Sequence, residues 1–243
     1  MSFAIQKLDI LAFGAHPDDI ELSCAGTLMA AIAQGKKVGV VDLTKGELGT
    51  RGTPELRLEE ATKAAAIIGL NIRINLGFAD GFFAHDATHQ LGIIQVIRAY
   101  QPDIVLANAI DDRHPDHARS AELTRHACFL SGLSKIETKL NGKGQAAFRP
   151  KAVYHYIQAL HVDPNFVVDI SAHFEKKLEA IRAFKSQFYN PKSNEPDTFI
   201  SSPQFIEFVK ARAIHFGVPA GVQYAEGFTV NKTLGIQDIV NLF

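Results

Sequence analysis

Two short clusters of histidine and aspartate are the residues of this sequence best suited to chemistry. They are His16, Asp18 and Asp19 in the stretch ILAFGAHPDD, and His114, Asp116 and His117 in the stretch DDRHPDH. Two imidazoles and one carboxylate make a three-ligand set for a catalytic zinc ion, with an open position left for water. The clusters together predict one shared metal site.

Each cluster directly follows a run of apolar residues. Residues 8–15 and 103–109 are mostly apolar and of strand length, which is typical of parallel strands covered on both faces. Open α/β sheets bind ligands at the carboxyl ends of their strands, so both clusters are expected on one rim of a sheet. The structural alternative is a strand-to-helix turn capped by aspartate. A cap needs only an oxygen acceptor, however, and both clusters contain histidine.

The rest of the chain alternates between helical and strand patterns. Helices are expected at 21–34, 54–69, 90–100 and 116–130, and further strands at 37–43 and 71–76. This order predicts an α/β fold, a Rossmann-like open and mostly parallel sheet with helices on both faces. The fingerprint G-x-G-x-x-G does not follow the first strand, which argues against a nucleotide cofactor.

The pattern changes after the stretch NGKGQ at 141–145. Strands are expected at 152–160, 166–170 and 222–230, and helices at 173–184 and 204–216, which predicts a mixed α/β C-terminal part. The segment 189–203 contains three prolines and is expected to be a loop, either a lid or a subunit contact.

Bulk properties limit the class of protein. With 243 residues, 47% apolar and 21% charged, the chain is expected to form a single domain over residues 1–243. The formal net charge of −1 argues against nucleic-acid binding. No stretch resembles a signal peptide or a transmembrane helix, and the two cysteines, Cys24 and Cys128, suit a reducing compartment, so a cytoplasmic protein without membrane contact is expected. Cys24 is interpreted as a small buried helix residue rather than a ligand.

The motifs also carry a family resemblance. AHPDD after an N-terminal strand and HPDH in the middle of the chain resemble the LmbE-like, or PIG-L, family of metal-dependent sugar N-deacetylases. The segments DLTKGELGTRGTPELRLEEA, NLGFAD, DDRHPDH, SQF and YAEGF resemble, in order, its bacillithiol-biosynthesis branch, the deacetylases of N-acetylglucosaminyl malate. The resemblance implies a small amino-sugar substrate and a homo-oligomer, with a hexamer as one form. A deacetylase of another substrate, such as diacetylchitobiose or a glycosyl inositol, is the alternative. A nonenzymatic sugar- or metal-binding module is a second alternative, for which Asp18 and His114 would be surplus.

The resemblance also assigns roles to the clustered residues. His16, Asp19 and His117 are expected to hold one divalent ion, zinc or else iron, manganese or cobalt, and Asp18 is expected to act as general base and then acid. His114 is expected to stabilise the oxyanion as a cation. Asp116 is expected to hold the His114 ring and raise its pKa, or else to serve only as a helix cap.

Three arginines near the same rim are candidates for substrate binding. Arg57 lies one turn into the helix that starts at Pro54, and the resemblance places this position on the sugar; a solvated partner of Glu60 is the alternative. Arg51 and Arg113 lie in loops and are natural partners for malyl carboxylates, although loop arginines are often only solvated. His85, His89 and His126 are interpreted as surface or packing histidines.

Overall fold

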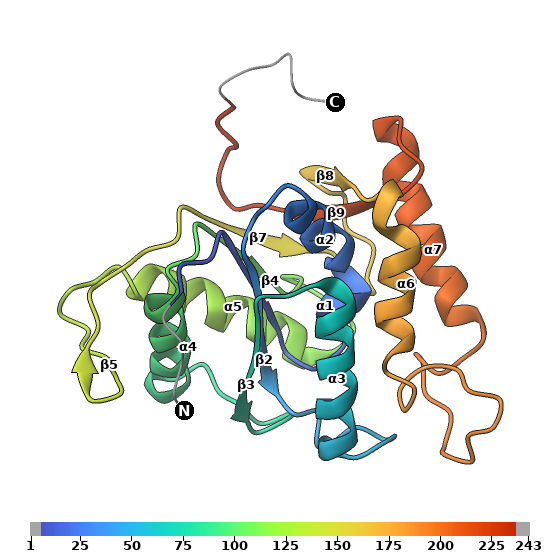
Figure 1. Ribbon diagram of the computed structural model, residues 1–243, viewed down its shortest axis with the longest axis horizontal. Helices are drawn as coiled ribbons and strands as arrows, with labels where there is room; N and C mark the ends of the chain where they lie inside the picture. Colours follow the sequence, from blue (N-terminus) through green and yellow to red (C-terminus); the bar gives the residue numbers. More distant parts are fainter. Residues whose placement is uncertain (1–5, 237–243) are drawn as a thin grey trace.

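One seven-stranded sheet runs through the molecule, which is described here by a computed structural model covering residues 6–236. The strand order is β3-β2-β1-β4-β7-β9-β8, and the strands from β3 to β7 are parallel neighbours. Figure 1 shows the sheet between two layers of helices. The predicted α/β class and the mostly parallel sheet are confirmed.

The first part of the chain forms the parallel half. Its elements are β1 (Ile10–Gly14), α1 (Asp19–Ser23), α2 (Ala25–Ala33), β2 (Val38–Thr44), α3 (Pro54–Ile68), β3 (Ile72–Phe78), α4 (Ala87–Tyr100), β4 (Ile104–Ala107) and α5 (Pro115–Leu130). None of the helices in the described residues combines the length and apolar character that crossing a bilayer requires.

Alternate residues of β1 enter two different cores, because successive side chains of a strand point to opposite faces. Leu11 and Phe13 pack with residues of α4 and α5, such as Ile93 and Leu123. Ala12 packs on the other face with residues of α1 and α2. Burial on both faces explains why the strand reads as a continuous apolar run.

The helix expected over 21–34 is two helices. Cys24, with φ −140°, separates α1 from α2. A Cβ on Gly26 would lie 2.7 Å from Ile170, so α2 approaches the chain near β8 at a point where only glycine fits. The first amides of α2 have a buried partner, since Glu226 accepts hydrogen bonds from the Gly26 and Thr27 N–H groups. The tertiary contact therefore overrides the continuous helical pattern.

The C-terminal part completes the sheet and covers one face. It consists of β5 (Lys139–Leu140), β6 (Lys143–Gly144), β7 (Ala152–Tyr156), β8 (Phe166–Asp169), α6 (Phe174–Arg182), α7 (Gln204–Gly217) and β9 (Ala225–Thr229). β9 lies between β7 and β8 and is antiparallel to both, so the predicted mixed character is confirmed. Lys177 on α6 donates to Glu226 and to the Leu22 carbonyl, which ties this part to α1.

Candidate metal centre and active site

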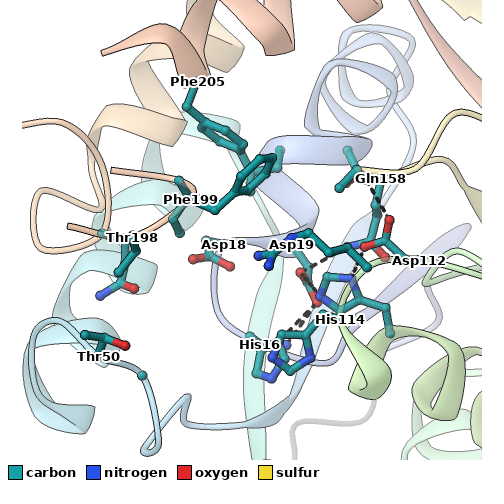
Figure 2. Close-up of a pocket in the computed structure, with 18 of the residues that line it drawn as sticks. His16, Asp18, Asp19, Thr50, Asp112, His114, Gln158, Thr198, Phe199 and Phe205 are labelled. Atoms are coloured by element: carbon teal, nitrogen blue, oxygen red, sulfur yellow. Dashed lines mark hydrogen bonds and ion pairs between the residues drawn. The ribbon is translucent and has the colours of Figure 1, made fainter. Parts of the chain in front are cut away.

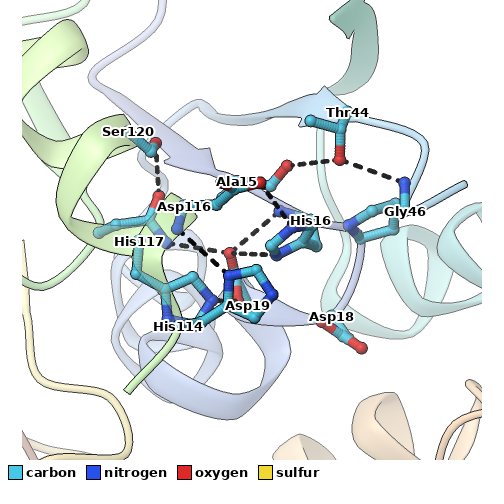
Figure 3. A network of polar contacts seen from close by, with 12 residues as sticks. Ala15, His16, Asp18, Asp19, Thr44, Gly46, His114, Asp116, His117 and Ser120 are labelled. Atoms are coloured by element: carbon cyan, nitrogen blue, oxygen red, sulfur yellow. Dashed lines mark hydrogen bonds and ion pairs between the residues drawn. The ribbon is translucent and has the colours of Figure 1, made fainter. Parts of the chain in front are cut away.

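The two predicted clusters meet at one rim of the sheet. β1 and β4 are parallel neighbours, so the turns that follow them emerge side by side. The centroid of the His16 ring lies 4.7 Å from that of His114 and 5.6 Å from that of His117. Figure 3 shows these rings gathered around Asp19. Two turns almost 100 residues apart in the sequence thus form one polar centre.

His16 has a carboxylate at each ring nitrogen. Its Nε2 lies 2.9 Å from Asp80 Oδ1 and 3.4 Å from Asp116 Oδ2. Its Nδ1 lies 3.9 Å from Asp19 Oδ2. Asp80 comes from the loop after β3, and it is the last residue of the segment NLGFAD that resembles the family.

His117, which follows the loop after β4, also has a carboxylate at each ring nitrogen. Its Nδ1 lies 2.5 Å from Asp112 Oδ2, and its Nε2 lies 3.1 Å from Asp19 Oδ1. Metal-ligating histidines usually donate their second ring N–H to a carboxylate or carbonyl, which fixes the ring and its tautomer. Asp80 and Asp112 occupy that orienting position for His16 and His117.

Asp19 is ionised and tightly held. Its carboxylate accepts hydrogen bonds from the His16 backbone N–H, Asn108 Nδ2 and Gln158 Nε2. Burial alone would raise the pKa of Asp19, but His117 and His16 hold this pKa well below its usual range. Asn108 and Gln158 were missed in the sequence, although Asn108 directly follows β4 and could have been found as a polar residue at the active rim.

The charge of this centre favours a cation. Burial lowers the pKa of His16, but Asp116, Asp80 and Asp19 outweigh it and raise the pKa to about 10. Burial likewise lowers the pKa of His117, which Asp19 and Asp112 raise to about 9. Carboxylates that attract protons so strongly also attract a divalent ion in their place, and binding then releases protons. The donor set fits a metal.

The identity of the third ligand is a prediction. Ligand nitrogens of His16, His114 and His117 lie within 4.8 Å of one another, so a three-imidazole set is also within reach. Asp19 lies against His117 and close to His16, as the expected set of His16, Asp19 and His117 requires.

Asp18 differs from its neighbour in backbone and in charge. Its φ of 123° lies in a region that side-chain-bearing residues rarely adopt, and such strain is concentrated at functional sites. Burial raises the pKa of Asp18 to about 7, although the Arg57 guanidinium lowers it in part. Figure 3 shows Asp18 to one side of the imidazoles. A carboxyl with this pKa can both accept and return a proton near neutral pH.

Arg57 is buried against the proposed base. Its Nη2 donates to Asp18 Oδ2 at 3.1 Å and to the Pro17 carbonyl at 2.6 Å, and its Nη1 donates to the Gly46 carbonyl at 3.2 Å. A Cβ on Gly46, whose φ is 66°, would lie 1.8 Å from Nη1. The loop between β2 and α3, which contains Gly46, is therefore shaped around this guanidinium. Arg57 is buried rather than solvated, and Asp18 is the carboxylate with which it forms an ion pair.

The contacts of His114 favour a neutral ring over the expected cation. The Asp116 backbone N–H donates to His114 Nδ1 at 3.2 Å, which is the arrangement of a neutral ring that carries its proton on Nε2. Burial, His16 and His117 lower the pKa of His114. The Asp116 carboxylate does not hold the ring; it accepts from the Gly81 N–H and Arg119 Nη1. His114 is the N-cap of α5, because Pro115 occupies the first helical position.

The centre opens into a cavity of about 330 Å³. Figure 2 shows His16, Asp18 and Asp19 on one side and Phe199 and Phe205 on the other. The apolar wall comes from residues 198–208 and consists of Thr198, Phe199, Ile200, Phe205 and Phe208. The loop expected at 189–203 therefore contributes part of the cavity wall.

The other two candidate arginines also line this cavity. Arg51 is only 3% exposed; its Nε is buried without a hydrogen-bond partner and lies 3.7 Å from Glu195 Oε2. Arg113 is exposed, and its guanidinium carbon lies 4.5 Å from the centroid of the Phe199 ring. The structure thus brings all three candidate arginines to one cavity, where Arg57 already forms an ion pair with Asp18.

Fold and site together define a class, an α/β protein with a cluster of potential His/Asp metal ligands at the ends of adjacent parallel strands. A family model described as PIG-L, GlcNAc-PI de-N-acetylase, matches residues 11–128. A diacetylchitobiose deacetylase of Thermococcus kodakarensis is 30% identical over 228 residues, which cover 90% of this chain and 81% of that protein. The chain belongs to the PIG-L, or LmbE-like, family of deacetylases.

Two further comparisons bear on the fold and on the branch. The solved structure of the conserved protein TT1542 from Thermus thermophilus shares 38% identity and a TM-score of 0.83, and the match covers 95% of this chain and 98% of that chain. A Bacillus anthracis protein named "Probable N-acetyl-alpha-D-glucosaminyl L-malate deacetylase 2" is 26% identical over 195 residues, 74% of this chain and 81% of that protein. The family is established, and the chain is a deacetylase-type enzyme; these relatives include more than one substrate branch.

Proposed function

We propose that the protein is a metal-dependent hydrolase that removes the acetyl group from an N-acetylglucosaminide. One observation carries this proposal, the different chemistry of two adjacent carboxyl groups. Asp19 is ionised against two imidazoles, whereas Asp18 has a pKa of about 7. Amide hydrolysis at a metal centre needs both a charged ligand and a separate group that moves protons.

His16, Asp19 and His117 would hold the divalent ion. When bound, the ion supplies Lewis acidity to the amide carbonyl and to the attacking water. Zinc suits two imidazoles and one carboxylate, while iron, manganese and cobalt compete according to geometry and availability.

Proton transfer falls to Asp18. Its carboxylate accepts a proton from the attacking water and returns it to the amine that leaves. The Arg57 guanidinium at 3.1 Å keeps this carboxyl in place and limits the rise of its pKa. The neutral His114 ring donates from Nε2 to the oxygen that develops negative charge, a role that requires a hydrogen-bond donor rather than a cation.

N-acetylglucosaminyl malate, in bacillithiol biosynthesis, is the substrate we favour. Malate adds two carboxylates to the sugar, and the cavity lining includes Arg51 and Arg113 in addition to Arg57 and to Arg212, which donates to the Gln158 and Leu22 carbonyls. Arg51 has a buried Nε without a hydrogen-bond partner, and the Arg113 guanidinium lies against an aromatic ring. Planar guanidinium groups bind carboxylates through paired hydrogen bonds. The resemblance to the B. anthracis protein supports the same branch.

Diacetylchitobiose is the second candidate, because the T. kodakarensis relative is the more similar of the two curated relatives described above. A side-by-side measurement of kcat/KM on N-acetylglucosaminyl malate, diacetylchitobiose and free N-acetylglucosamine separates the two. The malate substrate is expected to exceed free N-acetylglucosamine by about ten- to a thousandfold, which corresponds to one or two charge-assisted contacts. A higher value for diacetylchitobiose would overturn the malate assignment, and no acetate release from any of the three would overturn the deacetylase.

A further inference from the structure

A second group of potential metal ligands lies on the surface, away from the active cavity. It consists of His85, in the loop between β3 and α4, and of Glu122 and His126 on α5. Glu122 and His126 are four residues apart, so both project from one face of the helix. In the described part of the chain, none of the three residues lines the active cavity.

The three side chains converge closely. His126 Nδ1 lies 2.7 Å from His85 Nε2, and the two ring centroids are 4.5 Å apart. His85 Nδ1 lies 3.7 Å from Glu122 Oε1. One potential ligand atom from each residue lies within 4.8 Å of the other two. We propose that His85, Glu122 and His126 form a second, surface site for a borderline divalent cation such as Zn²⁺, Ni²⁺ or Cu²⁺.

The donor set selects this class of cation. Two imidazole nitrogens and one carboxylate suit zinc, nickel and copper, whereas calcium and magnesium take oxygen ligands. The remaining coordination positions face water, since His85 and Glu122 are exposed and His126 is half-buried. The site is therefore open and exchanges its ion with solvent.

Arg125 sets the condition for binding. Its Nη2 lies 2.7 Å from His126 Nε2, and a guanidinium can only donate, so Nε2 accepts and the proton of His126 lies on Nδ1. That proton is shared with His85 Nε2. A cation bound by Nδ1 displaces this proton, and the ring stays neutral by taking up a proton at Nε2 from solvent; Nε2 then no longer accepts, so the exposed Arg125 side chain must turn away. Arg125 thus competes with the cation.

The location gives the ion a structural consequence. The loop that carries His85 also carries Asp80, which is bonded to His16, and Gly81, whose N–H donates to Asp116. Helix α5 carries His114 and His117 near its start. A cation held by His85 and His126 cross-links the two segments that position these parts of the active centre.

The test is a metal titration of the full protein after one equivalent of zinc has filled the centre of His16, Asp19 and His117. Isothermal calorimetry measures binding of the second equivalent, and metal analysis after dialysis counts the ions that remain bound. The wild type is expected to bind one further Zn²⁺ or Ni²⁺ per chain. His126→Ala and His85→Ala are expected to lose this second equivalent and to retain the first. His89→Ala is the matched control, since His89 is a neighbouring histidine that bonds Asp86 and is not part of the group.

Arg125→Ala supplies a readout that a nonspecific surface histidine would not give. Removing the competing hydrogen bond, which contributes roughly 0.5–1.5 kcal/mol, is expected to tighten the second equivalent by about two- to tenfold. The electron paramagnetic resonance spectrum of a second equivalent of Cu²⁺ should show two nitrogen ligands in the wild type and fewer in His126→Ala. The proposal is overturned if the wild type binds no second equivalent, or if His85→Ala and His126→Ala bind it as the wild type does. The latter result would place the ion at His16, Asp80 and Asp116 in the main centre instead.

Discussion

The polar centre at the strand ends and the apolar wall of residues 198–208 differ in how their side chains are held. In the centre, the ring nitrogens of His16 and His117 and the oxygens of Asp19 all face polar partners that are themselves buried or half-buried. The wall of residues 198–208 consists largely of aromatic rings packed on one another, and Phe199 is 48% exposed. The centre is therefore rigid and common to any amide substrate, while the wall can adapt to the group attached to the sugar. Changes in the centre should remove chemistry, and changes at the wall should alter selection.

The largest effect is expected from loss of an imidazole in the centre. His117→Ala should lose both the bound metal and all detectable acetate release, because it removes a ligand and leaves Asp19 without its closest cationic partner. Metal analysis of the purified variant and an acetate assay on all three substrates check this. A variant with full metal content and activity would remove His117 from the centre.

Asp18→Asn should separate chemistry from metal binding. The variant is expected to retain the metal while kcat falls by roughly a hundredfold to ten-thousandfold, as loss of a general acid and base does. The fall should be equal for malate and chitobiose substrates, since Asp18 is expected to act on the acetamide group that both share and not on the group attached to the sugar. If Asn at this position instead releases the metal, the roles of Asp18 and Asp19 are exchanged.

Asp112→Asn tests the orientation of His117. Outer partners of metal-binding histidines typically contribute ten- to a hundredfold in metal affinity, so competition with a chelator should show a loss of about this size. Asp163→Asn is a suitable control, because Asp163 is an exposed carboxylate that faces His161 near the surface. Equal metal affinity in the two variants would show that the Asp112–His117 contact does not orient the ligand.

Arg113→Ala tests the side of the cavity at the wall, because the Arg113 guanidinium lies over the Phe199 ring. Its guanidinium is expected to bind a malate carboxylate, so the preference for N-acetylglucosaminyl malate over free N-acetylglucosamine should fall by about tenfold, the lower end for a charge-assisted hydrogen bond. The kcat on free N-acetylglucosamine should not change. A parallel fall on both substrates would place Arg113 on the shared sugar or in the chemistry.

The pH dependence should give the smallest effect. The pKa of Asp18 is raised to about 7, so its basic form is lost as pH falls through this value. At pH 7 the wild-type kcat/KM should be about half of its plateau value at high pH. Below pH 7 it should fall about tenfold for each pH unit. The ratio between the malate and free-sugar substrates should stay constant from pH 6 to pH 8, because arginine remains charged. If the ratio of the two kcat/KM values changes as pH falls from 8 to 6, a group that binds the malate part of the substrate must also titrate in this range.

The sequence predicted the clustered histidines and aspartates of the centre better than the residues that hold them in place. Apolar runs and the residues that follow them located both His/Asp turns, because strand burial and strand ends are local features. Asp80, Asn108 and Gln158 reach the centre from three different loops, and a single sequence does not show which distant polar groups meet. The division between α1 and α2 depends on Ile170 and Glu226 in the same way. The hydrogen bond that His114 accepts as an N-cap was within reach, since Pro115 marks the first position of a helix.

The position of β9 has a consequence for synthesis on the ribosome. This strand is the last in the described chain, yet it lies between β7 and β8 in the sheet. While residues 225–229 remain in the exit tunnel, β7 presents an open edge to other nascent chains, and the first amides of α2 lack the Glu226 carboxylate. The strands that precede the two His/Asp turns emerge early, but the sheet closes only after β9 has left the tunnel.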